Sequence, residues 1–296
     1  MRVLRSLLFA PANHPRHVEK ALSGAADGVI LDLEDAVAVA EKPDARHAAR
    51  RVLEARGSTT GPTAFVRINS LTTPFAYDDL RVIVGPGLDA VIVPKVESAA
   101  QIATVDWLLS QLERAASLPD RTVEVMPIIE TAAGLAHVAE IAVSSPRLRR
   151  LNFGAGDFSL DTNMTWTVGH EGLLWARVQV VIASRASGLE PPLDTVYARL
   201  DDDEGLAREA AQALRLGYQG KACIHPRQVE IVNATFTPSE EETSHAREIV
   251  TAFERAEADG IASIRVGGQF IDYPVAERAR KTLAVAAQIA ARSLRT

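Results

Sequence analysis

The stretch GVILDLEDAV, residues 28–37, is an apolar run that ends among three acids. Its first four residues predict a buried strand, because short continuous apolar runs with β-branched residues are typical of parallel sheets. Asp32, Glu34 and Asp35 follow within four residues, and carboxylates this close repel and raise one another's pKa. A metal ion, an arginine, a proton or open water must offset that repulsion, so the end of this strand is a candidate functional site.

Further apolar runs of this kind recur along the chain, with longer amphipathic segments between them. One such segment begins with Ser98, a residue type that commonly caps the N-terminus of a helix. Strands that alternate with helices indicate βα units and a parallel sheet. The predicted strands are residues 5–10, 28–33, 63–69, 89–95, 123–130, 150–156, 194–198 and 221–226.

A polar residue recurs where successive predicted strands end. From Asp32 to Arg67, Lys95, Glu130 and Asp157, the intervals are 35, 28, 35 and 27 residues. A (β/α)8 barrel carries its chemistry at the carboxyl end of its strands, and its βα units give a period of this length. The spacing therefore favours a barrel with one polar residue per unit at the same rim.

The competing arrangement is a doubly wound open sheet. That fold predicts a glycine-rich phosphate-binding turn after the first strand, and FAPANHPRH at residues 9–17 contains no glycine. Eight candidate strands by residue 226 fit the barrel. We therefore expect an α/β fold, a (β/α)8 TIM barrel that occupies residues 1–235.

The C-terminal residues depart from the βα pattern. Residues 238–260 predict a helix that starts with acids and ends at a glycine. A hairpin around Gly267 and Gly268 and an alanine-rich helix over residues 274–292 follow. We expect residues 236–296 to form a C-terminal helical arm that packs on the barrel or on a neighbouring subunit.

Composition excludes several classes of protein. The chain has 296 residues and a net charge of −6 with no long basic run, which argues against nucleic acid as a partner. A single cysteine, Cys223, allows no internal disulfide and favours a reducing compartment. No apolar run approaches the roughly 20 residues of a membrane helix, and the N-terminal apolar stretch is too short for a signal peptide. We expect a soluble cytoplasmic protein without a membrane partner.

Glu130 and Asp157 end predicted strands that are neighbours in the barrel. Carboxylates at one rim suit Mg²⁺, which accepts one or two protein carboxylates and keeps positions for water and substrate oxygens. The alternative is that each caps the helix that follows its strand. The metal site is the better interpretation because both carboxylates fall on neighbouring strands.

Arg67 is expected to point into the barrel mouth, where it can grip a carboxylate or enolate oxygen. The alternative is a structural ion pair with Asp32, Glu34 or Asp35, and the two roles are compatible. Lys95 is a candidate for a Schiff base. We favour a protonated, ion-paired lysine instead, because acids flank it.

Three further residues have a functional and a structural interpretation. His225 is a candidate general base, but a neutral, hydrogen-bonded histidine before a proline is favoured. Cys223 is expected to be a buried, inert thiol. Asp272, before Pro274, has the position of a turn or helix-cap residue.

Eight motifs together resemble one protein family, the citrate lyase β-subunit-like group of the HpcH/HpaI aldolase family, within the pyruvate/phosphoenolpyruvate barrel superfamily. The motifs are RSLLFAPANH, LDLEDAV, VRIN, VPKVE, PIIETAAGL, FGAGDFSLD, GKACIHPRQ and GQFIDYP, in this order over nearly the whole chain. The resemblance implies a TIM barrel with a C-terminal extension, usually a homotrimer. It also implies Mg²⁺-dependent cleavage or formation of a carbon–carbon bond in short 3-hydroxyacyl-CoA thioesters of the malyl-, methylmalyl-, citramalyl- or citryl-CoA type, which gives an acyl-CoA and a keto acid.

The resemblance also implies roles for individual residues. Glu130 and Asp157 match the metal ligands, and Arg67 matches the arginine that binds the carboxylate or the keto acid. Asp272 matches an acid that the C-terminal arm delivers into a neighbouring subunit's active site. This implication replaces the cap role that the sequence alone favours for Asp272.

The remaining polar residues are expected to support these. Glu34 and Asp35 would hold waters of the metal and orient Arg67. Asp32 need do no more than pair with a lysine or arginine inside the barrel. The cations expected to contact substrate are Lys95 at its strand end and, for the CoA phosphates, His14, Arg16 and Lys20 near the first strand.

Other activities remain open on the sequence alone. The alternatives are an aldolase that acts on free hydroxy acids with pyruvate as donor, a malyl-CoA-type thioesterase, and a non-catalytic subunit that binds CoA esters. The chain also departs from many relatives at NMTWTVGHEG, residues 163–172, where they have a short glycine-rich segment. The loop over the site is therefore expected to differ.

Overall fold

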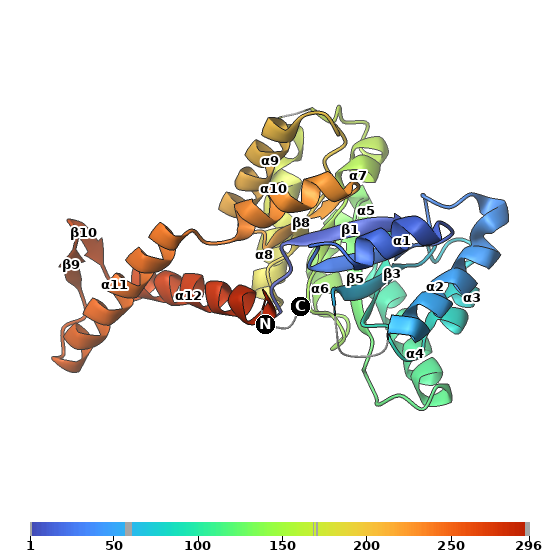
Figure 1. Cartoon of the computed structure of the whole chain (residues 1–296), viewed down its shortest axis with the longest axis horizontal. Coiled ribbons are helices and arrows are strands. Elements are labelled where there is room, and N and C mark those ends of the chain that lie inside the picture. Colours follow the sequence, from blue (N-terminus) through green and yellow to red (C-terminus); the bar gives the residue numbers. More distant parts are fainter. Residues whose placement is uncertain (1, 57–60, 168, 170, 294–296) are drawn as a thin grey trace. The chain divides into compact units, whose positions relative to one another are not determined.

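The computed structural model describes residues 2–56, 61–167, 169 and 171–293. Within NMTWTVGHEG, Val168 and His170 lie outside the described residues. Two compact units make up the chain (Figure 1). Leu4–Phe236 form the larger unit, and the described part of the smaller one comprises residues 2–3 and 237–293.

The larger unit is a closed barrel of eight parallel strands in chain order, with β8 paired to β1. This confirms the predicted TIM barrel. Closure brings the carboxyl ends of all eight strands to one rim. The strands are β1 (Ser6–Pro11), β2 (Gly28–Asp32), β3 (Thr63–Arg67), β4 (Ala90–Val93), β5 (Glu124–Ile129), β6 (Asn152–Phe153), β7 (Leu193–Asp194) and β8 (Gly220–Cys223).

Helices connect the strands around the barrel (Figure 1). The predicted helix start at Ser98 is confirmed. Its hydroxyl accepts the N–H of Gln101, whose side chain accepts the N–H of Ser98 in return, as in a capping box. The helices of this unit are α1 (Pro15–Leu22), α2 (Lys42–Arg56), α3 (Ala76–Ile83), α4 (Ala99–Ala115), α5 (Ala132–Ala136), α6 (Val138–Ala142), α7 (Ala155–Asp161), α8 (Leu174–Ala186), α9 (Asp203–Leu216) and α10 (Pro226–Phe236), with short 3-10 turns at Val39–Glu41 and Glu171–Leu173.

Side chains of the strands supply two cores. Because side chains alternate along a strand, one set packs inside the barrel and the other packs under the helices. Paired residues of parallel strands share a face, so the register identifies the inner set. The inner apolar cluster includes Leu7, Ile30, Phe65, Ile92, Met126, Ile128 and Leu193.

The seventh strand differs from its prediction. It covers Leu193–Asp194 rather than residues 194–198. The β-branched run beyond Asp194 leaves the ladder, and the Thr195 hydroxyl accepts the N–H of Ala155 at 2.9 Å instead. Strand β6 is likewise shorter than predicted, since its end turns directly into α7.

The smaller unit contains the predicted helix, hairpin and helix. They are α11 (Glu240–Ala258), β9 (Ile264–Val266), β10 (Gln269–Ile271) and α12 (Tyr273–Ser293). Gly267 and Gly268 have φ of 54° and 86°, values that a tight hairpin requires and that glycine adopts without steric cost. None of the helices within the described residues is both long and apolar enough to cross a membrane.

Candidate active site

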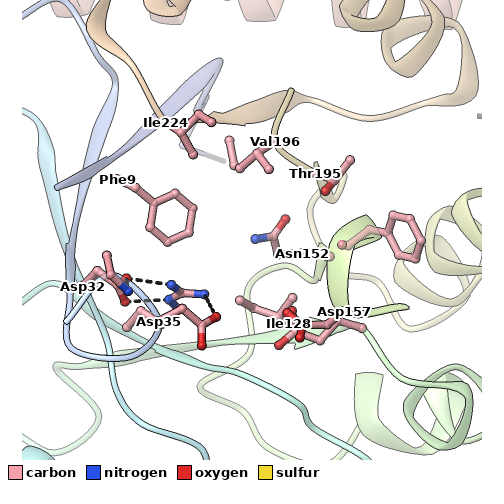
Figure 2. A pocket seen from close by; sticks show the side chains of 16 residues that line it. Phe9, Asp32, Asp35, Ile128, Asn152, Asp157, Thr195, Val196 and Ile224 are labelled. Carbon is pink, nitrogen blue, oxygen red and sulfur yellow. Dashed lines mark hydrogen bonds and ion pairs between the residues drawn. The ribbon is translucent and has the colours of Figure 1, made fainter. Parts of the chain in front are cut away.

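A cavity of about 400 Å³ opens among the strand ends of the barrel (Figure 2). Its lining is divided chemically into a charged wall and an apolar wall. The charged residues that line it are Asp32, Asp35, Arg67, Glu130 and Asp157. The apolar ones include Phe9, Ile128, Val196 and Ile224.

Arg67 resolves the repulsion among the three acids after β2. Its Nε and Nη2 donate to the two carboxylate oxygens of Asp32, each at 2.6 Å. Its Nη1 lies 3.0 Å from Glu34 Oε2 and 3.4 Å from Asp35 Oδ2. Burial alone would raise the pKa of Asp32, but the hydrogen bonds and charge of Arg67 outweigh it and hold this pKa below its usual value. The guanidinium also lies 4.8 Å from the ring centroid of Phe9, so it is held on two sides.

Lys42 supports this loop and was not predicted from the sequence. Its buried ammonium donates to the carbonyls of Leu33 and Glu34 at 2.8 and 2.7 Å. Burial lowers the pKa of Lys42, although Asp32 and other nearby carboxylates oppose this shift. In sequence Lys42 is only the first residue of an amphipathic helix, a position that does not reveal a contact with the preceding strand end.

Lys95 is ion-paired, as favoured from the sequence. Its Nζ lies 2.7 Å from Glu34 Oε1 and 3.7 Å from Asp157 Oδ1. Burial would lower the pKa of Lys95, but Glu34 outweighs it and raises the pKa above its usual value. A charged amine is no nucleophile, so a Schiff base is disfavoured. Lys95 also adopts φ of 52°, a strained value for a residue with a side chain.

The backbone of Lys95 forms a hydrogen bond with the side chain of Glu130. The Lys95 N–H donates to Glu130 Oε1 at 2.8 Å. Glu130 is buried, and burial, with the nearby carboxylates of Asp157 and Glu34, raises its pKa to about 8. A Cβ at Gly154 would lie 2.5 Å from Glu130 Oε2, so a glycine is required there to leave room for this carboxylate.

Neither candidate metal ligand caps a helix, so the capping alternative is wrong for both. Thr131 caps α5, and its hydroxyl accepts the N–H of Gly134. Gly154 occupies the cap position of α7, which places Asp157 in the first turn with its side chain partly exposed at the cavity.

The donor set fits Mg²⁺. Burial and the nearby carboxylate of Asp157 make it costly to ionise Glu130, and a divalent cation would offset that cost. No group of three or more His, Cys, Asp or Glu side chains positioned to hold a metal occurs in the part of the chain that the structure describes. Two carboxylates with open positions are what Mg²⁺ accepts, since it keeps several waters.

The remaining predicted residues lie apart from the charged wall. His225 Nδ1 accepts the N–H of Arg227 at 3.2 Å, the hydrogen-bonded role favoured from the sequence. Cys223 is fully buried, and burial raises the pKa of its thiol to about 12, so it is the inert thiol expected. Arg16 and Lys20 are exposed on α1 and, like His14, do not line the cavity.

Asp272 belongs to the smaller unit, between β10 and α12. Its Oδ1 accepts the N–H of Val275 at 3.3 Å, and its carbonyl accepts the N–H of Ala276 at 2.9 Å. The side chain thus caps the start of α12. This is the local role that the residues alone suggested, and it does not test a role in another subunit.

The apolar wall and Asn152 were not singled out from the sequence. They lie inside or just after predicted strands, where apolar residues are expected, and nothing in the sequence separates cavity-lining positions from core positions. Asn152 is a polar residue within the predicted strand RLNFGAG at residues 150–156, so a closer inspection of that strand would have found it.

Two family models match the chain. One, described as HpcH/HpaI aldolase/citrate lyase, matches residues 5–226. The other, described as carbon–carbon bond lyase of the TIM-barrel fold, matches residues 178–287.

Individual relatives cover almost the whole chain. The citrate lyase subunit beta of Leuconostoc mesenteroides subsp. cremoris is 36% identical over 96% of this chain and 94% of that protein. The L-malyl-CoA/beta-methylmalyl-CoA lyase of Rhodobacter capsulatus is 38% identical over 92% of this chain and 91% of that protein. A crystal structure of the protein CitE from Mycobacterium tuberculosis, in complex with magnesium, acetoacetate and coenzyme A, superposes with a TM-score of 0.77. It is 32% identical and covers 96% of this chain and 98% of that one.

Proposed function

This chain belongs to the HpcH/HpaI aldolase/citrate lyase family and is a carbon–carbon lyase, and we propose that it acts with Mg²⁺ on short 3-hydroxyacyl-CoA thioesters. The proposed substrates are of the malyl-, methylmalyl-, citramalyl- or citryl-CoA type, and the products are an acyl-CoA and a keto acid. One observation supports this function above all: Glu130 and Asp157 face the same cavity as Arg67, and a bound cation would offset the repulsion that raises the pKa of Glu130.

Glu130 and Asp157 would hold the metal. When bound there, Mg²⁺ supplies Lewis-acid polarisation of the keto acid's carbonyl. The names of the relatives support the substrate class, since one is a lyase of malyl-CoA and β-methylmalyl-CoA. The CitE structure, with magnesium, acetoacetate and coenzyme A together, supports the ligand set.

Arg67 would stabilise the negative charge that develops on the thioester enolate. Its bidentate pairing with Asp32 fixes the guanidinium plane, so the group costs no reorganisation during the reaction. Glu34 and Asp35 would orient Arg67 and Lys95 from the opposite side. Lys95 remains protonated beside them and can contact the substrate carboxylate.

Cleavage requires two proton transfers. A base removes the proton from the substrate hydroxyl, the carbon–carbon bond breaks, and the electron pair passes to the thioester enolate. Asp272, delivered from the C-terminal arm of a neighbouring subunit in a homotrimer, would protonate the enolate carbon. In the synthetic direction the same carboxylate would remove a proton from the thioester methyl group.

The CoA moiety would be bound outside the cavity. His14, Arg16 and Lys20 lie exposed on or beside α1, after the first strand. Arg16 and Lys20 can bind its phosphates as cations, and His14 can donate a hydrogen bond to them.

A product-identified screen tests the proposed function. Purified protein is incubated with matched hydroxyacyl-CoA thioesters and free hydroxy acids, with Mg²⁺ or with EDTA. We expect an acyl-CoA and a keto acid, only from thioesters and only with Mg²⁺. Cleavage of free acids alone would indicate the aldolase alternative, and an intact hydroxy acid with free CoA would indicate a thioesterase. Binding of CoA esters without turnover would indicate a non-catalytic subunit.

A further inference from the structure

Asn152 is a polar residue in an apolar layer of the barrel. It opens β6, and its register partners are Ile128 of β5 and Leu193 of β7. Both partners belong to the apolar cluster inside the barrel, and paired residues of parallel strands face the same side. Asn152 therefore faces the barrel interior, at a level where its neighbours are hydrocarbon.

The side-chain oxygen of Asn152 is unpaired in the part of the chain that the structure describes. The residue is 4% exposed, and its Oδ1 lacks a hydrogen-bond partner among the described residues. Buried polar atoms are almost always paired, so each exception calls for an explanation. Asn69 shows the usual case: it is equally buried, and its backbone N–H and Nδ2 donate to Asp79 at 2.9 and 2.6 Å.

Asn152 also lines the cavity. Figure 2 shows its amide among the residues that line the cavity, with its register partner Ile128 drawn below it. Along the strand it precedes Gly154, which packs against Glu130, by two residues, or about 7 Å of strand rise. Asn152 thus lies one layer deeper in the barrel than the proposed metal ligands.

We propose that Asn152 binds the keto-acid half of the substrate by a hydrogen bond from its amide to the α-carboxylate. This inference rests on the proposed function. A keto acid bound at Glu130 and Asp157 would extend one layer deeper into the barrel. At that level the amide of Asn152 is the polar group that can bind its carboxylate. The terminal torsion of asparagine is roughly two-fold, so either end of the amide can turn to the ligand.

The charges in the cavity explain why the hydrogen-bond donor at position 152 is neutral. The cavity is lined by four carboxylates and by Arg67, which is already paired with Asp32. An amide can donate a hydrogen bond to an anion without adding a charge to this wall. The proposal concerns the α-carboxylate because this group is common to all keto acids, whereas oxaloacetate carries a distal carboxylate as well.

Thermal unfolding of the metal-free protein separates a ligand-binding amide from a structural one. Asn152→Leu should leave the melting temperature unchanged or raise it, because the variant replaces an unpaired amide by hydrocarbon in an apolar layer. Asn69→Leu is the matched control and should lower the melting temperature, because the buried Asp79 loses the Nδ2 donor of Asn69. A loss in Asn152→Leu as large as that in Asn69→Leu would overturn the inference.

Calorimetric titration then measures the affinity for keto acids. With Mg²⁺ present, Asn152→Leu should weaken binding of glyoxylate, pyruvate and oxaloacetate alike by about tenfold or more, the factor of one hydrogen bond to a charged group. Asn152→Asp, of the same shape but anionic, should weaken it further. Affinities for Mg²⁺ and acetyl-CoA should stay within about twofold of the wild type, since other residues bind them.

Unchanged keto-acid affinity in both variants, or a loss confined to oxaloacetate, would contradict the assignment. So would a wild-type protein that binds no keto acid. A third outcome would overturn the proposed function alone. In that outcome the wild-type protein binds keto acids and Asn152→Leu abolishes this binding, but the wild-type protein forms no acyl-CoA and keto acid from thioesters.

Discussion

At the scale of single residues, Glu130 carries the largest electrostatic cost in the cavity. Burial and the neighbouring carboxylates raise its pKa from 4.5 to about 8, so near neutral pH the metal-free protein holds it largely protonated. A metal ligand must be ionised, and the same environment that penalises the free carboxylate therefore favours a bound cation.

Glu130→Gln should stabilise the metal-free protein in a pH-dependent way. Below the unfolded pKa of 4.5 both states hold the proton, so the glutamate costs nothing there. Between that value and about 8 the unfolded chain releases the proton while the folded one keeps it, and wild-type stability falls. Denaturant unfolding in EDTA should show a gain on the order of 5 kcal/mol above pH 8 and almost none near pH 4.5. An equal gain at both pH values would contradict the assigned pKa; exposed Glu97→Gln controls for the change in net charge.

Gly154→Ala should disturb the metal site without straining the backbone, since φ there is −112°. The new Cβ would lie 2.5 Å from Glu130 Oε2 and displace that carboxylate. We expect Mg²⁺ affinity to fall about tenfold or more, as measured by titration calorimetry. Gly156→Ala is the control, because its Cβ would meet Trp166 at an ordinary 3.5 Å. Equal effects of the two variants would exclude a specific role for Gly154.

At the scale of elements, the loop at the end of β2 is stabilised by the helix α2, which begins several residues later in the sequence. The ammonium of Lys42, at the start of α2, binds two consecutive carbonyls of the acidic loop. Asp32 receives the N–H groups of Glu34 and Ala36, each at 3.0 Å. These contacts fix the loop that positions Arg67.

Lys42→Met should keep the hydrocarbon stem but leave the carbonyls of Leu33 and Glu34 without their donor. We expect a loss of about 1–3 kcal/mol in the free energy of unfolding and a lower kcat, because the acids around Arg67 lose their fixed position. Lys281→Met, on the exposed face of α12, should stay within about 0.5 kcal/mol of the wild type. If Lys42→Met keeps wild-type stability and kcat, the acidic loop does not depend on this lysine.

At the scale of the whole molecule, the chain consists of a closed barrel and a separate helical unit. The barrel carries Arg67, Glu130 and Asp157, whereas Asp272 belongs to the other unit. Because the proposed proton donor and the proposed metal ligands belong to different units, we propose that two chains contribute to one site.

Mixing two inactive variants tests that division. Asp272→Ala and Glu130→Ala protein should each lack activity, whereas mixed oligomers should recover a fraction, because one site of a mixed trimer combines an intact barrel with an intact arm. Turnover after verified subunit exchange is the measurement. Each variant mixed with itself is the control, and absent recovery would contradict the delivery of Asp272 between subunits.

The sequence by itself determined the barrel and its functional rim. Apolar β-branched runs at a βα period specify parallel strands, and closure carries the polar residue after each strand to the same end, so Glu130, Asp157 and Arg67 could be placed at one site. The helix start at Ser98 and the glycine pair of the hairpin could also be predicted, because each depends only on residues that are close in sequence. Strand β7 was mislocated, since a two-residue strand leaves almost no pattern.

Only the tertiary structure decided which charges pair and which remain open. Whether Arg67 neutralises Asp32 or Glu34, and whether Glu130 caps a helix or faces the cavity, depends on distances between strands, which spacing in sequence does not contain. The contacts of Lys42 and the unpaired oxygen of Asn152 could not be predicted from the sequence for the same reason. Lys42 binds carbonyls from an earlier strand end, and Asn152 has a side-chain oxygen without a hydrogen-bond partner among the described residues. Pairing and burial are properties of three-dimensional neighbourhoods, and electrostatic energy follows those neighbourhoods rather than the order of residues.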